Sequence, residues 1–233
     1  MRFRVFAIAM LLAPSLTLTA ASADAEWFVD LYAGGAFTQK DDVKTVVTTE
    51  GFGSGTLNLK DIKFDNSYSV GGRAGYWLAA LPYVGLGLDV SHFRPDIGAQ
   101  KVDATIFGLP GTVTLLDDMD VRVVAVSLDL MLRWPLMKTA DFPNGRLQPY
   151  VTAGPAIFFT EAEFAGDSDS DRSLGFKAGA GVTFLITKNF GVFGEYRFTR
   201  FSPELKFTSG GSSSKFEPDI NTHHPLVGAS LRF

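Results

Sequence analysis

Two pairs of adjacent residues are the first places to look for acid–base or nucleophilic chemistry in this chain. His223-His224 lies near the end of the sequence, and Glu195 or Asp219 could orient one of these imidazoles as a general base. Ser91-His92 has the residue types of a nucleophile and its base, but consecutive side chains of a strand point to opposite faces. We therefore predict no catalytic residue and no enzymatic activity.

An acidic run over residues 167–171, with Asp at every second position, resembles the start of a calcium-binding loop. The rest of that motif is missing: the sixth position has no glycine, and Ala178 stands at the twelfth, where a bidentate Glu is required. The chain contains no Cys, which excludes disulfides and thiolate metal sites, and it has no nucleotide-binding fingerprint. We predict a solvated loop tip, no metal site and no cofactor.

A third chemically active group consists of charges on the polar face of segments in which apolar residues occupy every second position. Four are acids and five are bases: Asp30, Arg73, Asp89, Asp129, Arg133, Lys177, Glu195, Arg197 and Arg232. Charges that leave water are tolerated when they are paired. If these residues share one interior, we expect a salt-bridged plug; the alternative is a narrow gated path for a small solute.

Eight segments carry this alternation, and they must position the charges. They cover approximately residues 27–37, 67–78, 84–91, 124–134, 147–159, 174–186, 190–200 and 223–233. A strand with one apolar face and one small or charged face lies between two different solvents. Beyond the N-terminal region no run approaches 18 apolar residues, which excludes helical membrane spans but is compatible with a membrane β-barrel.

The connections between these segments alternate between short and long, as in barrels that have short turns on one side of a membrane and long loops on the other. The sequence therefore predicts an all-β fold, an eight-stranded antiparallel up-and-down transmembrane β-barrel with long extracellular loops. Two long connections can form hairpins, 43–49 with 56–62 and 101–107 with 112–116. These hairpins either extend neighbouring strands beyond the bilayer or enter the barrel, which would then have ten or twelve strands.

The N-terminal residues predict a secretory signal peptide over residues 1–23, followed by a barrel domain over 24–233. Arg2 and Arg4 precede an apolar run, and Ala21-Ser22-Ala23 supplies small residues before a cleavage site at Asp24. Removing the two arginines leaves 19 basic and 25 acidic residues, because the printed sequence has 21 and 25. This acidic balance disfavours nucleic-acid binding.

Several motifs resemble the OmpA-like outer-membrane β-barrel family, in particular its stand-alone porin-family and surface-antigen-like members. The similar stretches are 30–35 (DLYAGG), 148–151 (QPYV) and 194–198 (GEYRF). Gly228, Leu231 and Phe233 resemble the C-terminal assembly signal of such barrels. The resemblance implies a Gram-negative outer-membrane protein, inserted by the barrel assembly machinery, with variable surface loops.

The leading functional hypothesis is a non-enzymatic structural or surface-interaction protein. Its external loops are expected to meet outer-membrane lipid, lipopolysaccharide and host or cell-surface ligands, and we expect a monomer. The alternative is a narrow channel for small or apolar solutes. A lipid-modifying enzyme is less favoured, because the His-x-Ser spacing of outer-membrane deacylases is absent, and a soluble lipocalin-like barrel would need an apolar interior.

Overall fold

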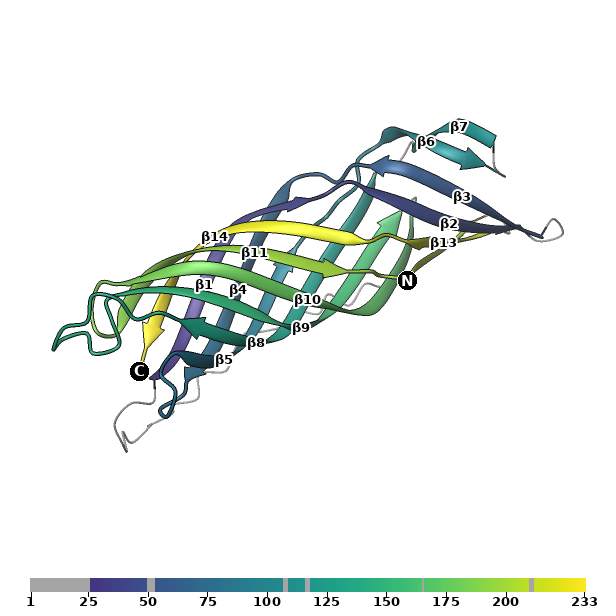
Figure 1. Cartoon of the computed structure of the whole chain (residues 1–233). Coiled ribbons are helices and arrows are strands. Elements are labelled where there is room, and N and C mark those ends of the chain that lie inside the picture. Colours follow the sequence, from purple (N-terminus) through teal and green to yellow (C-terminus); the bar gives the residue numbers. More distant parts are fainter. Residues whose placement is uncertain (1–25, 50–52, 107–108, 116–117, 165, 210–211) are drawn as a thin grey trace.

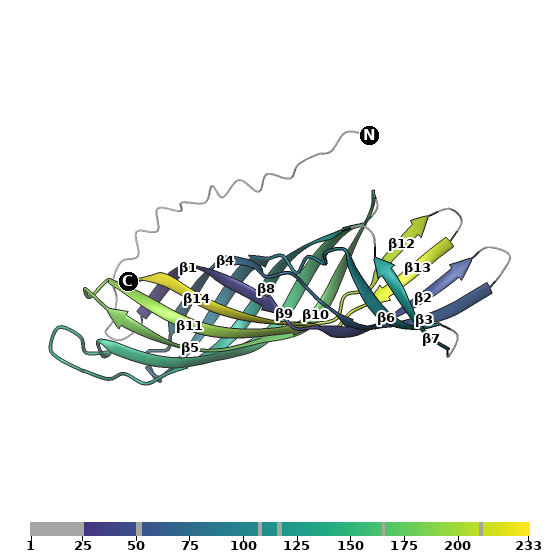
Figure 2. The same ribbon diagram turned by 90° about the horizontal axis from the view of Figure 1, so that it is seen from above.

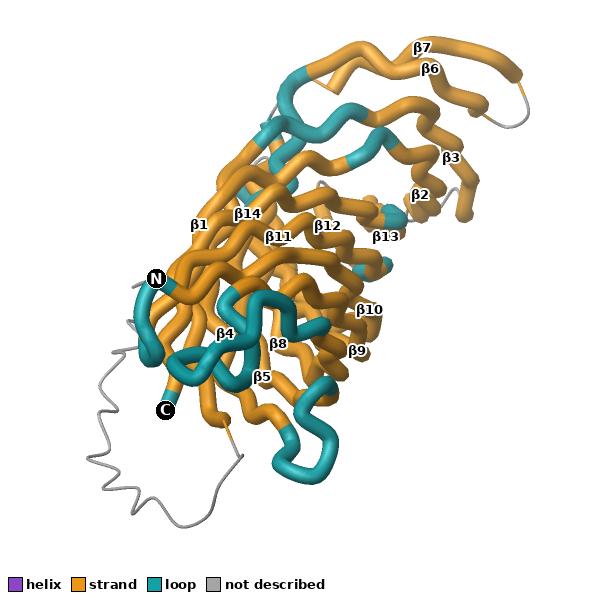
Figure 3. Tube along the Cα trace, turned by 60° about the vertical axis from the view of Figure 1, so that its left-hand side comes forward, coloured by secondary structure: helices purple, strands orange, loops and turns teal. Residues whose placement is uncertain are grey.

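The computed structural model describes the chain except for residues 1–25, 50–52, 107–108, 116–117, 165 and 210–211. The predicted signal peptide therefore lies outside the described residues. The described residues form fourteen strands and no helix (Figure 3). Among them there is accordingly no helix of the length and apolar character that crossing a membrane requires.

Eight strands form a closed antiparallel barrel (Figure 1). Their bounds are β1 Glu26–Thr38, β4 Ser67–Trp77, β5 Val84–Phe93, β8 Met119–Arg133, β9 Leu147–Phe164, β10 Asp167–Leu185, β11 Phe190–Phe201 and β14 Ile220–Arg232. Their order around the barrel is β1-β14-β11-β10-β9-β8-β5-β4, and β1 pairs with both β4 and β14, so no edge is left in this sheet. The predicted eight-stranded barrel is confirmed.

The other six strands form a second sheet, here called the hairpin sheet. They are β2 Asp41–Thr49, β3 Gly53–Ile62, β6 Gln100–Ile106, β7 Leu109–Leu115, β12 Leu205–Ser209 and β13 Ser212–Glu217, in the order β12-β13-β2-β3-β6-β7. They project from one end of the barrel, the hairpin end, whereas the chain ends at the other, the short-turn end (Figure 2). Both predicted hairpins form, but the alternative with ten or twelve barrel strands is wrong, because the hairpins pair with one another.

The prediction of a solvated loop tip over residues 167–171 is wrong. β9 and β10 continue as a ladder in which Thr160 pairs with Asp171 and Phe164 pairs with Asp167. The acidic run is therefore the first part of β10 rather than a loop tip. Its carboxylates are hydrogen-bond acceptors, because Asp169 accepts from the backbone N–H of Lys206 and Asp171 accepts from that of Glu204, which attaches β12 to β10.

The faces of the barrel strands explain both the fold and the missed strand ends. Along the wide middle of the barrel the outward side chains are apolar, as at Leu88 and Leu128. Near the hairpin end the polarity is inverted: Val121 and Val123 are buried inside, and Arg122 between them is exposed. β8 begins at Met119, five residues before the expected segment. The sequence pattern did not indicate these residues as a strand, because the solvent around the barrel changes there from apolar to aqueous and the polarity of the two faces inverts.

Candidate functional site

A layer of buried charges crosses the middle of the barrel interior. The Arg73 guanidinium lies 2.9 Å from the Asp30 carboxylate and 3.0 Å from Glu195. Glu195 also pairs with Arg197 at 2.6 Å and accepts a hydrogen bond of 2.7 Å from the Tyr150 hydroxyl. Because β4 and β11 are three strands apart around the barrel, the bond between Arg73 and Glu195 spans the lumen.

Asp89 organises the other half of this central layer. Its carboxylate pairs with Lys177 and, at 3.3 Å, with Arg197, and it accepts a hydrogen bond of 2.8 Å from the Tyr32 hydroxyl. β5 and β11 lie on opposite sides of the eight-stranded ring, so the contact between Asp89 and Arg197 crosses the full interior. Ser230 completes the layer by donating to Asp30 at 2.6 Å.

All nine charges selected from the sequence are buried in the structure, but they do not form one cluster. Six share the central layer: Asp30, Arg73, Asp89, Lys177, Glu195 and Arg197. Asp129 is buried, and its Oδ1 has no hydrogen-bond partner among the described residues. Arg133 and Arg232 lie at the short-turn end and share Glu26, at 2.7 and 3.5 Å. The roles of these residues remain proposals.

Glu26 is a member of this second charge cluster that the sequence analysis missed. It opens β1, and its side chain is on the same face as Phe28 and Asp30, so the alternation would have identified it had the first segment begun one residue earlier. Asn144 also donates to Glu26 at 3.0 Å. The Arg133 guanidinium is stacked over the Trp77 ring at 4.2 Å, which fixes it in the interior.

A third layer, which is aromatic, fills the interior near the hairpin end. The rings of Phe158 and Phe201 are stacked with centroids 4.1 Å apart, and Phe93 lies 6.2 Å from Phe201 and 4.9 Å from the His224 ring. Phe93 and Phe201 come from β5 and β11, which face each other across the barrel. Sequence analysis missed this layer, although the inverted polarity of β8 was a signal for it.

The aromatic layer continues into the hairpin sheet. Phe93, Phe158 and Phe201 belong to one buried apolar cluster together with Leu59 of β3 and Val102 of β6. The hairpin sheet and the hairpin end of the barrel interior therefore share one buried apolar cluster. Just before β12, hydrogen bonds from Lys215 and Lys206 lower the pKa of the Glu204 carboxyl.

The two candidate catalytic pairs are not assembled into a reactive site. His223 is on the outer face, where its imidazole bonds to the Tyr196 hydroxyl at 2.6 Å, whereas His224 points inward and bonds to the Thr199 hydroxyl at 3.1 Å. Ser91 and His92 also point to opposite faces, as their positions on one strand require. The described residues contain no group of three or more His, Cys, Asp or Glu that could hold a metal ion.

The predicted assembly-signal residues lie on the last strand and just beyond it. Leu231 and Phe233 are exposed on the outer face of the barrel. At Gly228 a Cβ atom would lie 2.4 Å from the Leu31 carbonyl oxygen and 2.5 Å from the Phe193 ring. The close approach of β14 to β1 therefore requires glycine there, and the role in assembly remains a prediction.

Comparison with known proteins agrees with this architecture. The family model for the outer membrane protein beta-barrel domain matches residues 10–233. The chain belongs to this family. It is therefore an outer-membrane protein. Barrels of this kind have short periplasmic turns and long external loops, so we predict that the short-turn end faces the periplasm and that the hairpin sheet lies outside the cell. No curated protein matches the chain.

Three solved structures have the same fold. Neisserial surface protein A has a TM-score of 0.52 and 12% identity, over 91% of this chain and 100% of that one. OprG from Pseudomonas aeruginosa has a TM-score of 0.53 and 14% identity, over 90% and 96%. A major outer membrane protein from Thermus thermophilus has a TM-score of 0.51 and 14% identity, over 91% and 100%. At these identities the similarity establishes the fold alone.

Proposed function

We propose that this protein is a non-enzymatic, non-conducting scaffold that presents a rigid sheet at the cell surface for contact with lipopolysaccharide and with host or cell-surface ligands. The observation that carries the proposal is the shared apolar cluster of the barrel and the hairpin sheet. Binding surfaces are effective when a rigid scaffold positions them. Here three connections that are distant in sequence form one sheet, and its buried apolar side chains belong to the same cluster as the aromatic layer.

The interior supports a scaffold rather than a pore. An eight-stranded barrel is just wide enough for side chains to fill it. Charge pairs span the lumen at the centre, aromatic rings meet across it near the hairpin end, and Arg133 reaches from β8 to Glu26 of β1 at the periplasmic end. We further infer that the protein is inserted by the barrel assembly machinery and functions as a monomer.

A hollow of about 490 Å³ on the outer wall supports contact with lipopolysaccharide. Its lining includes Phe159 and Arg172 together with the carboxylates of Glu161 and Asp171, and the Arg172 guanidinium lies over the Phe159 ring at 5.3 Å. Arg122 is exposed nearby on β8, where its neighbour on β9 in the strand register is Glu161. Neither arginine has a carboxylate within 4.0 Å among the described residues. The hollow lies where the apolar band ends, so phosphate would meet arginine while acyl chains meet Phe159.

Replacing both Arg122 and Arg172 with glutamine is expected to weaken binding of bisphosphorylated lipid A by roughly 10- to 30-fold, since each basic residue near an anionic lipid surface contributes about 1 kcal/mol. Native mass spectrometry of the folded barrel measures this loss. Arg200→Gln is the matched control, because Arg200 is also exposed and already pairs with Asp219 at 3.4 Å. Equal loss in the control, or no loss in the double variant, would contradict the assignment.

The alternative function, a narrow channel for small or apolar solutes, rests on the mixed charges of the central layer. We expect the refolded protein to form a heat-modifiable barrel that gives no single-channel openings in planar bilayers, because the Arg73 and Asp89 pairs cross its lumen. Reproducible openings that change when Arg73 or Glu195 is neutralised would instead establish a pore with a charged constriction.

A further inference from the structure

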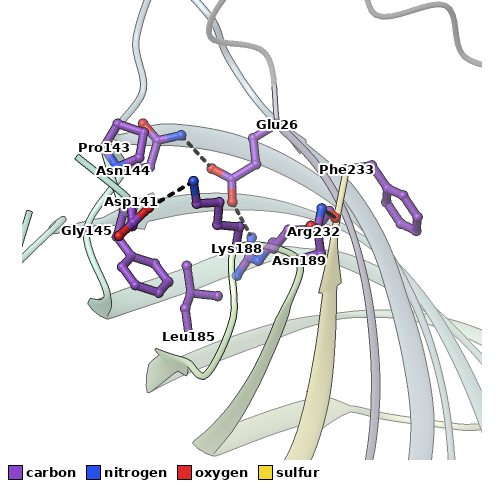
Figure 4. Close-up of a pocket in the computed structure, with 11 residues that line it drawn as sticks. Glu26, Asp141, Pro143, Asn144, Gly145, Leu185, Lys188, Asn189, Arg232 and Phe233 are labelled. Atoms are coloured by element: carbon purple, nitrogen blue, oxygen red, sulfur yellow. Dashed lines mark hydrogen bonds and ion pairs between the residues drawn. The ribbon is translucent and has the colours of Figure 1, made fainter. Parts of the chain in front are cut away.

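Two hollows of the barrel differ in how their charged side chains are used. The hollow of about 290 Å³ at the short-turn end is lined by charges that pair with one another (Figure 4). Lys188 pairs with Asp141 at 3.0 Å, and Arg232 pairs with Glu26 at 3.5 Å. The other is the hollow of about 490 Å³ on the outer wall that contains Arg172, here called the wall hollow. Its charges are not paired in this way.

The wall hollow is lined by one unpaired base and one unpaired acid. Arg172 has no carboxylate within 4.0 Å, as noted above. Glu161 is exposed, and no basic nitrogen of the described residues lies within 4.0 Å of its carboxylate. Asp171 also lines the hollow, but its carboxylate already accepts a hydrogen bond of 3.1 Å from the backbone N–H of Glu204. The lining therefore offers a ligand one positive and one negative side chain.

The order of the side chains along the outer wall matches the order of groups in a lipid. Toward the hairpin end, the outward residues of β10 are Leu174, which is 79% exposed, then Arg172 and Ser170. On β9, Phe159 is followed by Glu161. Arg172 is the register neighbour of Phe159, and Ser170 is that of Glu161. Apolar surface is therefore followed by a guanidinium group and then, farther from the apolar band, by a carboxylate.

The spacing of the two charges favours a ligand that carries both signs. Arg172 and Glu161 are diagonal neighbours on paired antiparallel strands, and such positions are roughly 7–8 Å apart. A phosphate alone would be attracted by Arg172 but repelled by Glu161, because like charges at short range disfavour each other. An ammonium group joined to the phosphate by a short link would remove this repulsion and pair with the carboxylate.

We propose that the wall hollow binds the phosphoethanolamine group of a lipid, with the phosphate at Arg172, the ammonium at Glu161 and the acyl chains along Phe159 and Leu174. The same group occurs in phosphatidylethanolamine and in lipid A that carries phosphoethanolamine. This inference rests on the proposed function, because it names the headgroup of the lipid that the outer wall contacts.

The test is native mass spectrometry of the full folded barrel with two lipid pairs. Phosphatidylethanolamine is compared with phosphatidylethanol, which lacks the ammonium group, and phosphoethanolamine-modified lipid A is compared with unmodified lipid A. In at least one pair, the lipid with the ammonium is expected to bind about 3- to 5-fold more tightly, the effect of one exposed ion pair. Glu161→Gln should abolish this preference without weakening the lipid that lacks the ammonium.

Glu163→Gln is the matched control, because Glu163 is the next outward residue of β9, is also exposed and does not line the hollow. It should leave the preference unchanged. The lipid pair in which the preference depends on Glu161 identifies the source of the headgroup.

Three outcomes would overturn the proposal: no dependence on Glu161 in either pair, equal loss of the preference in Glu163→Gln, or equal weakening of both lipids of a pair in Glu161→Gln. In each case, lipid A binding that depends on Arg122 and Arg172 would still support the proposed function. Absence of all lipid A binding would instead contradict the lipopolysaccharide contact itself, so the two failures are distinguishable.

Discussion

Replacing Arg73 with methionine is expected to lower the free energy of unfolding by about 3–5 kcal/mol, the usual cost of removing one partner of a buried ion pair. The substitution leaves the carboxylates of Asp30 and Glu195 buried without their shared cation. The Tyr150 and Ser230 hydroxyls would still donate to them, but neutral donors do not compensate the charge. Urea titration of the barrel folded in lipid vesicles, followed by heat-modifiability on gels, measures the change.

Arg94 provides the matched control for Arg73. It also pairs with two carboxylates, Asp96 at 3.3 Å and Asp120 at 3.0 Å, but its side chain is 28% exposed at the hairpin end. Arg94→Met is therefore expected to cost less than about 1 kcal/mol. Combining Arg73→Met with Asp30→Asn and Glu195→Gln should recover part of the loss, because the two carboxylates that shared Arg73 are then neutral. The recovery is expected to be incomplete, because Arg197 also loses Glu195 and keeps only Asp89, which it shares with Lys177. A loss of the same size in Arg94→Met would mean that burial does not determine the cost.

The sequence predicted the barrel because its wall separates two different solvents. Along β14, for example, Val227 and Leu231 are outward and Ser230 and Arg232 are inward, so each strand carries the full pattern locally. No knowledge of distant contacts is needed to recognise such a strand. The same alternation placed all nine charges in the interior, since residues of one parity share one face.

The hairpin end was predicted less well, for two physical reasons. Beyond the apolar band the outside is water, so the polarity of the faces inverts: on β9, Phe159 is outward and apolar, whereas Glu161 at the next outward position is charged. Because of this inversion, the ends of these strands were predicted to be loops. The hairpin sheet also depends on pairs such as Lys215 with Val46, which are far apart in sequence and leave no local signal.

The site was predicted in composition but not in arrangement. Alternation assigns a side chain to the interior, but it does not give the position of that side chain along the barrel axis. That position depends on the stagger between the tilted strands. Arg133 and Arg73 are therefore both interior, yet Arg133 pairs with Glu26 in a separate cluster while Arg73 joins the central layer. No spacing in the sequence indicates that separation.

Replacing Phe201 with alanine is expected to lower the free energy of unfolding by about 3–5 kcal/mol, as for other large-to-small changes in a packed core. The Phe201 ring is 1% exposed and stacks on Phe158, and both belong to the cluster that supports the hairpin sheet. Loss of this ring should therefore act at a distance, so that backbone amides of β3 and β6 exchange with solvent on the order of 10-fold faster. Urea titration and hydrogen exchange measure the two effects.

Phe198→Ala is the control on the same strand. Its ring lies on the outer wall, 5.9 Å from that of Phe176, so its removal is expected to cost about 1 kcal/mol or less and to leave the exchange of β3 and β6 unchanged. If Phe201→Ala destabilises the barrel while the hairpin sheet keeps its protection, the sheet is stabilised by its own strand pairing. In that case the hairpin sheet alone would be the scaffold, because it would keep its structure when the aromatic layer of the barrel is weakened.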